Sequence, residues 1–337
     1  MTGQSGPAHP QARRGTAAEL FQTMLAQFQQ VERLPREQQL AHQLQAADFL
    51  LQHVWQQSAF HRGRLSAAGW EPGVPLTPEA WHRLPVLTRQ DVQTAGDSLF
   101  SRQLPPHHGQ RATAHTSGST GEPVRVQTTG LTGLYWNALT LRDYDWHGAD
   151  YSAKVATIRH FFQDGVGEPP DGTHLPNWGG VIARVRSTGP AAVLHMTADV
   201  ETQARWLLDQ NPEHLVTMPT VLQALLDWFR QHDRELPGLR TVRTVGEPVT
   251  PELRQQCRQV WQASLIDVYS SQEIGYIGLQ CPETERYHVP VESLLVEVLD
   301  DSGQPCQPGE VGRVVITSLH NYATGLIRYE IGDYAEV

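Results

Sequence analysis

Short apolar runs alternate with helical stretches between residues 110 and 270, and this alternation constrains the fold more than any other feature of the chain. The apolar runs are rich in β-branched residues and predict strands, and the stretches between them have the length and spacing of helices. Alternation at this spacing predicts an α/β fold, with a largely parallel sheet covered by helices. The predicted strands are 124–128, 154–159, 191–195, 214–217, 241–245 and 265–269, and the predicted helices are 131–145, 200–210, 219–232 and 250–262.

The segments on either side of this region have other patterns. Residues 1–15 are polar and are expected to form a disordered leader. Between Ala17 and Leu65, apolar residues recur at three- and four-residue steps, which predicts a pair of amphipathic surface helices. From Tyr287 onward the helical pattern stops, and three short strands predict a small antiparallel sheet or distorted barrel. These strands are 294–299, 311–316 and 326–330.

The length of 337 residues favours one large domain from residue 16 onward. It divides into a helical lead-in (16–110), an α/β core (111–285) and a β subdomain (286–337). With 26 basic and 36 acidic residues the net charge is −10, which argues against a nucleic-acid partner. No apolar run reaches the roughly 20 residues that span a membrane. Three widely spaced cysteines are typical of a reducing cytoplasm, where we expect this protein.

A run of hydroxyl residues and glycines, His115–Arg125 (HTSGSTGEPVR), leads into the first predicted strand. Its glycines permit positive φ angles and a close approach to a ligand, and its successive N–H groups can form a nest for an anion. A polar hairpin turn is the alternative interpretation. The lysine-containing P-loop pattern GxxxxGK[ST] is absent, so that class of nucleotide hydrolase is disfavoured. The residues concerned are Thr116, Ser117, Gly118, Ser119, Thr120 and Gly121.

Three later segments follow this run in order: Gly246–Pro248 (GEP), Asp267–Gly275 (DVYSSQEIG) and Ile327–Asp333 (IRYEIGD). Taken singly, the first and the last have the ordinary interpretation of a turn between elements. Together the four segments resemble the adenylate-forming superfamily of acyl-CoA synthetases and luciferases, and within it the phenylacetate–CoA ligase branch. The match covers residues 115–333 through its motifs, and the N-terminal third is also similar to this branch.

The resemblance implies the fold of the large N-terminal domain of these enzymes. It also implies a reaction in which a carboxylic acid and ATP give acyl-AMP and pyrophosphate, after which a thiol, most often CoA, takes the acyl group. The chain departs from the common motifs at several positions. Many members have lysine after Pro123, where this chain has Val124 and Arg125, and Ser270 and Gln272 stand where Gly and Thr are common.

The resemblance also assigns roles to single residues. The hydroxyl and glycine loop would hold the phosphates, with Thr120 and Glu273 acting in catalysis. Glu273 would hold Mg²⁺, since a hard cation prefers carboxylate oxygen. Tyr269 and the turn Gly246-Glu247-Pro248 would flank adenine, and Asp333 would accept hydrogen bonds from both ribose hydroxyls. The predicted nucleotide site is completed by Asp267, Ser270, Ser271 and Gln272.

The acid is expected to bind between the end of the strand 154–159 and the adenine segments. His160 and Phe161 follow that strand and are predicted to form a wall of the pocket, to which Trp178 and Gly179 are added. The alternative is that Phe161 belongs to the hydrophobic core. The aromatic side chains favour an aryl or apolar acid.

Cys281 and His288 resemble two of the zinc ligands found in this branch, whose other two ligands form a later C-x-C pair. A free cysteine and a surface histidine are the alternative, because a structural zinc site needs four ligands. The resemblance further implies a small C-terminal domain with a catalytic lysine, which we expect to lie outside this chain. Lys154, the single lysine, begins a predicted strand and is expected at the sheet edge or the surface.

The sequence alone is compatible with several functions. The chain by itself is expected to be weakly active or inactive, as the nucleotide- and acid-binding part of an acid–thiol ligase. A non-catalytic homologue that acts as a binding or assembly subunit is the first alternative. Transfer of the acyl group to a carrier-protein thiol or an amine, instead of CoA, is the second. A homodimer is a further arrangement that we consider.

Overall fold

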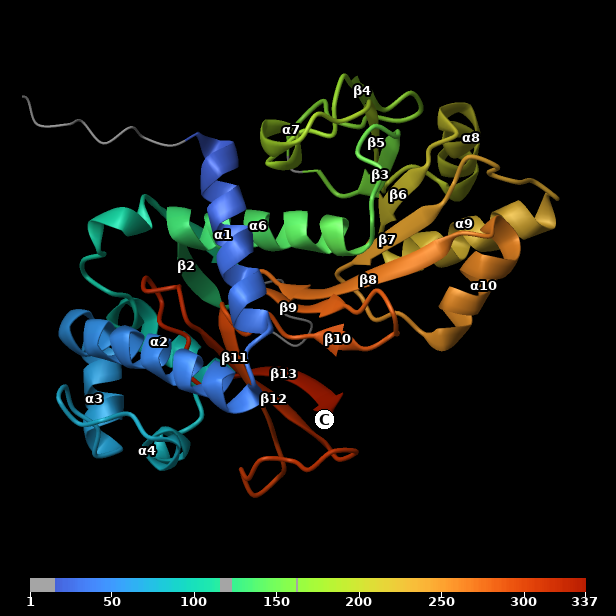
Figure 1. The fold of residues 1–337 in the computed structure, drawn as a ribbon. Coiled ribbons are helices and arrows are strands. Elements are labelled where there is room, and N and C mark those ends of the chain that lie inside the picture. Colours follow the sequence, from blue (N-terminus) through green and yellow to red (C-terminus); the bar gives the residue numbers. More distant parts are fainter. Residues whose placement is uncertain (1–15, 116–122, 162) are drawn as a thin grey trace, which may run out of the picture.

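The computed structural model describes residues 16–115, 123–161 and 163–337. Over these residues, an eight-stranded sheet with the order β10-β9-β8-β7-β6-β3-β5-β4 forms the centre of the fold (Figure 1). The five strands from β8 to β5 run parallel, and the edge strands β4, β9 and β10 are antiparallel to their neighbours. The strands are β3 (Val155–Arg159), β4 (Thr173–Leu175), β5 (Ala191–His195), β6 (His214–Thr217), β7 (Thr241–Val245), β8 (Ser264–Ser271), β9 (Gly275–Gln280) and β10 (Tyr287–His288). The predicted parallel sheet is confirmed.

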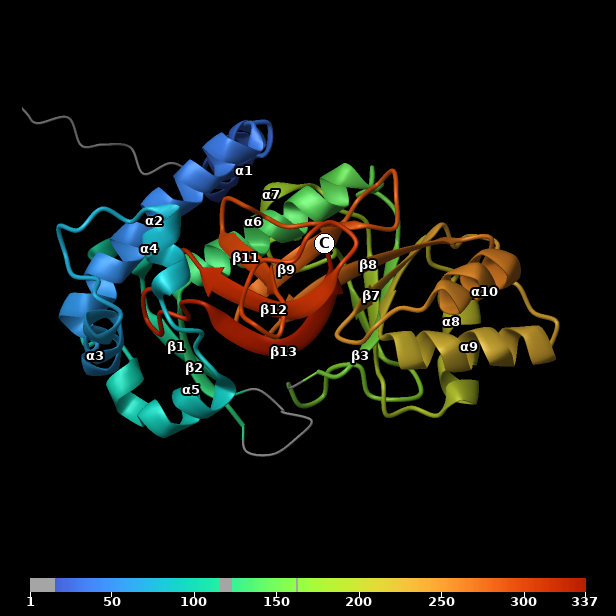
Figure 2. The same cartoon turned by 90° about the horizontal axis from the view of Figure 1, so that it is seen from below.

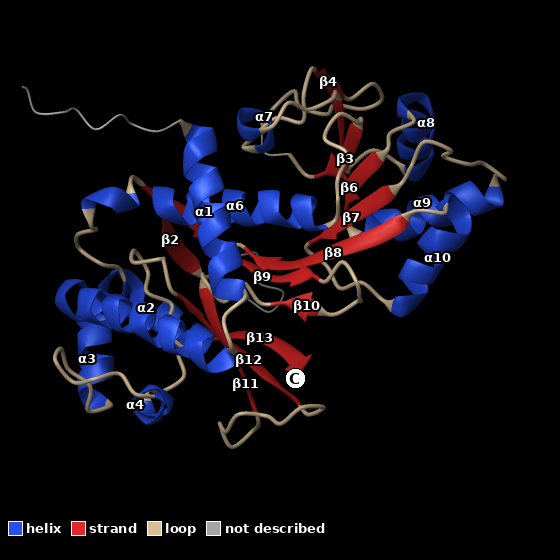
Figure 3. Ribbon diagram, viewed as in Figure 1, coloured by secondary structure: helices blue, strands red, loops and turns tan. Residues whose placement is uncertain are grey.

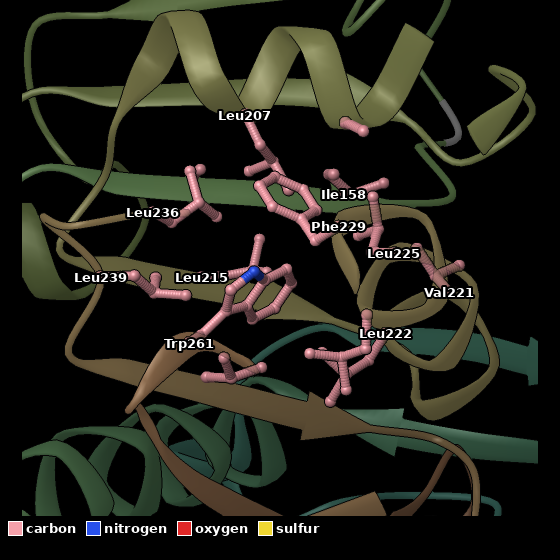
Figure 4. Close-up of a cluster of buried hydrophobic side chains, with 14 of the residues drawn as sticks. Ile158, Leu207, Leu215, Val221, Leu222, Leu225, Phe229, Leu236, Leu239 and Trp261 are labelled. Carbon is pink, nitrogen blue, oxygen red and sulfur yellow. The ribbon is translucent and has the colours of Figure 1, made fainter. Parts of the chain in front are cut away.

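Three helices cover one face of this sheet: α8 (Val200–Gln210), α9 (Pro219–Gln231) and α10 (Pro251–Trp261). Each helix begins with a residue that favours a helix N-terminus. Asp199 is the N-cap of α8, Thr250 is the N-cap of α10, and Pro219 is the first residue of α9. Leucines at helical spacing on α9 pack with Phe229 and Trp261 against β3 and β6 (Figure 4). Figure 3 shows how strands and helices alternate along this half of the chain.

The opposite face is covered by α6 (Gly130–Trp146) and, beyond it, α1 (Ala17–Glu32). A buried ion pair ties α6 to the sheet: Arg243 of β7 donates from Nε to Asp143 at 2.8 Å. The Arg243 guanidinium also lies over the ring of Tyr144, 4.0 Å from its centre. Both charged side chains are almost completely buried, so the pair fixes the position of α6 over the strand ends.

The N-terminal region differs from the predicted pair of surface helices. It contains three helices, α1, α2 (Arg36–Gln57) and α3 (Ala59–Ala67), followed by the shorter α4 (Pro78–Arg83) and α5 (Arg89–Ala95). The single predicted second helix is divided at Ser58, whose extended backbone ends α2 and whose hydroxyl accepts from His61 N to cap α3. The apolar face of α2 is a core element, since Leu50, Leu51 and Val54 are fully buried.

The C-terminal strands β11 (Leu294–Leu299), β12 (Val311–Ser318) and β13 (Tyr329–Glu336) form the predicted small antiparallel sheet, and Figure 2 shows them side by side. The third strand begins three residues later than predicted, because Arg328 has a positive φ of 52° that interrupts an extended backbone. A separate two-stranded antiparallel sheet of β1 (Arg111–His115) and β2 (Arg125–Thr129) was predicted only in its second strand.

Lys154 lies directly before β3, where Nζ donates to the Gln210 carbonyl at 2.9 Å. Because β3 is an interior strand, Lys154 does not lie on an edge strand, but its partly exposed side chain agrees with the other predicted position, the surface. It stands at the amino end of the parallel strands. Within the described part of the chain, no helix has the length and apolar character needed to cross a membrane.

Candidate functional site

A cleft of about 790 Å³ opens at the carboxyl ends of the parallel strands β3, β6 and β7. Residues that end or follow these strands form one wall, and the first half of α6 forms another. In open parallel sheets, ligands bind at this edge because the loops there leave a crevice between them. The strand ends contribute Arg159, His160, Phe161, Met218, Val245 and Gly246, and α6 with its cap contributes Thr129, Thr132, Gly133, Tyr135, Trp136 and Leu139.

Five of the predicted site residues line this cleft: His160, Phe161, Gly246, Gln272 and Glu273. The structure therefore brings together segments that are more than 100 positions apart in the sequence. Glu273 lies in the turn between β8 and β9, and its side chain is largely buried at the cleft wall. A single carboxylate in such a position fits Mg²⁺, which commonly takes one or two protein carboxylates besides substrate oxygens.

The predicted adenine segment forms a tight turn after β7. Gly246 has a φ of 83°, a conformation that favours glycine. The carboxylate of Glu247 accepts two hydrogen bonds from Thr220 at the start of α9, one from the backbone N–H at 2.8 Å and one from the hydroxyl at 3.0 Å. Glu247 thus positions the turn, whereas Pro248 is exposed beside it.

Replacing Glu247 by alanine is expected to lower the free energy of unfolding by about 1–2 kcal/mol, since two hydrogen bonds to a carboxylate at a helix N-terminus are lost. Urea unfolding of this variant and of Thr220→Val, which removes only the hydroxyl donor, measures both contributions. A fall in nucleotide affinity without any loss of stability would contradict the positioning role and indicate direct ligand contact.

Tyr269 and Asp333, 64 positions apart, meet at 2.5 Å, where the Tyr269 hydroxyl donates to Asp333 Oδ2. Burial and this hydrogen bond raise the pKa of Tyr269, and the nearby Glu273 carboxylate raises it further. Tyr269, Asp333 and Glu273 therefore lie close together. Ser270 and Ser271 are half-buried at the end of β8, and the Ser271 hydroxyl accepts from Ile274 N at 3.2 Å to close the turn around Glu273.

Asp267 is placed differently from the prediction. Its carboxylate is buried inside the sheet, where it accepts from the Thr244 hydroxyl at 2.6 Å and from the Tyr287 hydroxyl at 2.5 Å. Both oxygens are therefore engaged by protein donors. The structure corrects the prediction that Asp267 binds nucleotide: it ties β8 to β7 and to the edge strand β10.

Trp178 and Gly179 are also placed away from the cleft. The indole of Trp178 donates to the Ala153 carbonyl at 2.8 Å, and its ring packs 5.4 Å from that of His214. Both contacts lie at the amino ends of β3 and β6, opposite to the cleft. The loop after β4 returns to this end of the sheet, so the structure corrects the prediction that these two residues form a pocket wall.

Cys281 and His288 face each other across the turn that joins β9 and β10. Hydrogen bonds from Thr284, from the backbone at Glu283 and from His288 lower the pKa of the Cys281 thiol to about 7. Over residues 16–115, 123–161 and 163–337, no group of three or more His, Cys, Asp or Glu side chains could hold a metal ion. The pair supplies two of the four ligands that a structural zinc site needs, so the described residues do not fit zinc by themselves.

The predicted phosphate loop, comprising Thr116, Ser117, Gly118, Ser119, Thr120 and Gly121, lies outside the described residues. The described flanks pair as β1 and β2, with His115 opposite Arg125. The α6 helix follows β2 directly, and its first turn lines the cleft.

Sequence reasoning missed several residues of the cleft. Tyr135 and Trp136 on α6, Tyr276 on β9 and His320 after β12 line it, and no local motif marks them. Arg159 was also missed, although it directly precedes His160; its guanidinium lies 5.6 Å from the centre of the Phe161 ring. Arg159 brings a positive charge to the wall of the cleft formed by the strand ends, where it could bind a carboxylate or a phosphate.

Comparison with known proteins relates this chain to a family. The AMP-binding enzyme family matches residues 37–325 of the chain. The phenylacetate-coenzyme A ligase of Thermus thermophilus is 27% identical over 313 residues, 90% of this chain and 67% of that protein. The corresponding ligase of Escherichia coli is 22% identical over 305 residues, 87% of this chain and 66% of that protein. The chain thus spans about two thirds of the length of these curated relatives.

A solved structure with a similar fold is that of 2-hydroxyisobutyryl-CoA ligase in complex with 2-HIB-AMP and CoA. It superposes with a TM-score of 0.68 at 19% identity, and the match covers 89% of this chain and 64% of that chain. At this identity the similarity concerns the fold alone. It agrees with the mostly parallel sheet flanked by helices and the small C-terminal antiparallel sheet.

Proposed function

The chain belongs to the AMP-binding enzyme family, and we propose that it binds ATP and a carboxylic acid and supports formation of acyl-AMP with release of pyrophosphate. The observation that carries this proposal is the convergence of three motif segments at one sheet edge. Gly246, Gln272 and Glu273 line the cleft, and Tyr269 beside them is hydrogen-bonded to Asp333. Nucleotide recognition accounts for this convergence, which a set of unrelated turns would not produce.

In the proposed reaction the acid carboxylate attacks the α-phosphorus of ATP, one P–O bond forms, and the bond to pyrophosphate breaks. There is little covalent work for the protein in such a transfer, so its residues act by positioning and charge. Asp333 holds the ribose, Tyr269 and the Gly246–Pro248 turn flank adenine, and Ser270, Ser271 and Gln272 face the α-phosphate. The loop 116–121, with Thr120 as its catalytic hydroxyl, holds the β- and γ-phosphates.

Glu273 is proposed as the protein ligand of Mg²⁺. When bound, the cation would screen the charge of the triphosphate and of the leaving pyrophosphate. Arg159 is proposed to orient the attacking carboxylate, because it brings a cation to the described wall of the cleft beside His160 and Phe161. The single lysine is at the other end of the strands and cannot serve there.

For the whole protein we propose a second step in which a thiol attacks the acyl carbonyl, the thioester forms, and AMP leaves. CoA is the first candidate, because the curated relatives are named coenzyme A ligases. A carrier-protein thiol or an amine is the alternative acceptor, and measuring product formation with each acceptor separates them. A cytoplasmic location, with the cysteines reduced, belongs to the same proposal.

The proposal is tested by calorimetry with ATP and Mg²⁺ and with a non-hydrolysable acyl-adenylate analogue. We expect saturable binding of both ligands at one site per chain. In Glu273→Gln, we expect ATP affinity to fall at least tenfold in the presence of Mg²⁺, since one charged ligand of the cation is lost. AMP without Mg²⁺ is the control, and its affinity should change little.

Two outcomes would contradict this function. Absence of binding for both nucleotides would remove the nucleotide site. Binding of ATP without any pyrophosphate release by the full-length protein, over a panel of aryl and fatty acids, would favour the non-catalytic alternative of a binding or assembly subunit.

A further inference from the structure

His320 lies at one end of the cleft, just after β12, and is 8% exposed. Its ring stacks on that of Tyr135 from α6, with ring centres 4.1 Å apart and an angle of 10° between the planes. This end is built from α6, the residue before β11 and the segment after β12. These elements differ from those that carry Gly246, Gln272 and Glu273.

A single contact decides which nitrogen of His320 carries the hydrogen. Nδ1 lies 3.3 Å from the backbone carbonyl oxygen of Ser293. A carbonyl oxygen only accepts, so Nδ1 must donate and must carry the hydrogen. In a neutral ring the other nitrogen, Nε2, then presents a lone pair.

The ring is neutral at physiological pH. Burial lowers the pKa of His320 to about 4, while the Ser293 carbonyl raises it and the neighbouring His108 lowers it. Because the pKa of His320 is lowered, the ring becomes charged only at acidic pH. At neutral pH, Nε2 is therefore a hydrogen-bond acceptor.

Other polar groups beside His320 are already engaged. The Asn321 amide donates to the Gln127 carbonyl at 3.0 Å and accepts from Ala323 N at 3.1 Å. The Ser293 hydroxyl donates to the Pro290 carbonyl at 3.1 Å. By contrast, Nε2 of His320 has no hydrogen-bond partner among the residues that the structure describes. Because His320 lines the cleft, this acceptor is available to a ligand that brings a matching donor.

The cleft also contains several aromatic side chains. Tyr135, Trp136 and Tyr276 line the cleft, and the rings of Trp136 and Tyr276 lie 4.8 Å apart. Flat apolar walls of this kind favour a flat ring, and a small number of polar groups then fixes its orientation.

We propose that the acid is an aromatic acid with a hydroxyl or amino group away from its carboxylate, and that this group donates a hydrogen bond to Nε2 of His320. The inference rests on the proposed function, because the carboxylate must face the nucleotide segments at Gly246 and Glu273. His320 is then a specificity-determining residue that reads the far end of the acid.

The test measures acid binding to the whole chain by calorimetry in the presence of AMP. The ligands are hydroxy- and methyl-substituted pairs of benzoate and phenylacetate, substituted at ring positions 3 and 4. Methyl and hydroxyl are similar in size, so each pair differs mainly in the donor. We expect the hydroxy acid of the best-fitting pair to bind about tenfold tighter than its methyl partner.

Variants assign this preference to one atom. His320→Phe keeps a flat ring against Tyr135 but removes the acceptor, and the preference should fall to about one. His320→Gln offers a carbonyl oxygen in the place of Nε2 and should keep part of it. Tyr322→Phe is the matched control: Tyr322 lies two positions after His320 but does not line the cleft, so the variant removes a nearby hydroxyl and should keep the preference.

The outcomes separate this inference from the proposed function. The wild-type chain alone gives the first outcome: if the hydroxy and methyl acids of every pair bind equally, the role of His320 is overturned. AMP binding in the same experiment would still support the nucleotide site. A preference that persists in folded His320→Phe would also overturn the role of His320. If AMP and the acyl-adenylate analogue fail to bind, the proposed function fails and this inference falls with it.

Discussion

Replacing Asp333 by asparagine is expected to weaken AMP binding about 100-fold, or about 2.7 kcal/mol. The carboxylate is proposed to accept hydrogen bonds from both ribose hydroxyls, and hydrogen bonds to a charged group contribute about 1.5–3 kcal/mol each. The Tyr269 hydroxyl already holds one oxygen at 2.5 Å, so the carboxylate is oriented before nucleotide arrives. Asparagine keeps the shape but loses the charge and one acceptor.

The control for Asp333 uses 2′,3′-dideoxy-AMP, which lacks both hydroxyls. Wild-type chain should bind this nucleotide about as weakly as Asp333→Asn binds AMP, and the variant should not distinguish the two nucleotides. Since Asp333 is exposed, the stability of the variant should change by less than about 0.5 kcal/mol. A variant that still prefers AMP to the dideoxy nucleotide by the wild-type factor would show that another group recognises the ribose.

The α/β core could be predicted because its signal is local. The predicted helix 200–210 and the strand 241–245 coincide with α8 and β7, and each has a clear apolar pattern between a cap and a turn. Strand β9 (Gly275–Gln280) was missed because its first residue is the last residue of a motif, and the turn before it is too short to mark a boundary. The break at Ser58 was missed because apolar residues continue at helical spacing on both sides of it.

The candidate site shows the same difference between residues with a local sequence signal and residues without one. Residues in contiguous motifs, such as Gly246 and Glu273, could be predicted from the family resemblance. Tyr135 and His320 could not, because they reach the cleft only through the way α6 and the C-terminal sheet pack on the central sheet. Asp267 shows the opposite error: it lies within a motif, yet alternation along β8 directs its side chain to Thr244 and Tyr287.

The segment Ile327–Asp333 also combines two roles that its sequence does not distinguish. Its last residue, Asp333, is exposed at the proposed ribose site, whereas Arg328 is 3% exposed. The Arg328 guanidinium donates to both oxygens of Glu297 on β11 at 3.0 Å, to the His82 carbonyl at 2.9 Å and to the Leu84 carbonyl. Arg328 therefore joins the C-terminal sheet to the end of α4.

Replacing Arg328 by methionine is expected to lower the free energy of unfolding by about 3–5 kcal/mol, the range found when one partner of a buried ion pair is removed. The Glu297 carboxylate would stay buried, with the Trp81 indole at 3.1 Å and the His82 ring at 3.6 Å as its remaining neighbours, and two backbone carbonyls would lose a partner. Urea unfolding followed by tryptophan fluorescence measures the change, since Trp81 lies in the affected cluster.

The matched control for Arg328 is Arg313→Met in the same small sheet. Arg313 pairs with Glu330 at 2.9 Å, but both side chains are about one quarter exposed, so its loss should cost about 1 kcal/mol or less. Equal effects of the two substitutions would contradict the argument, because burial and not charge pairing is what separates them. A large loss at Arg328 alone would mean that this motif residue stabilises the fold through its buried contacts, a role separate from the one proposed for Asp333 five positions later.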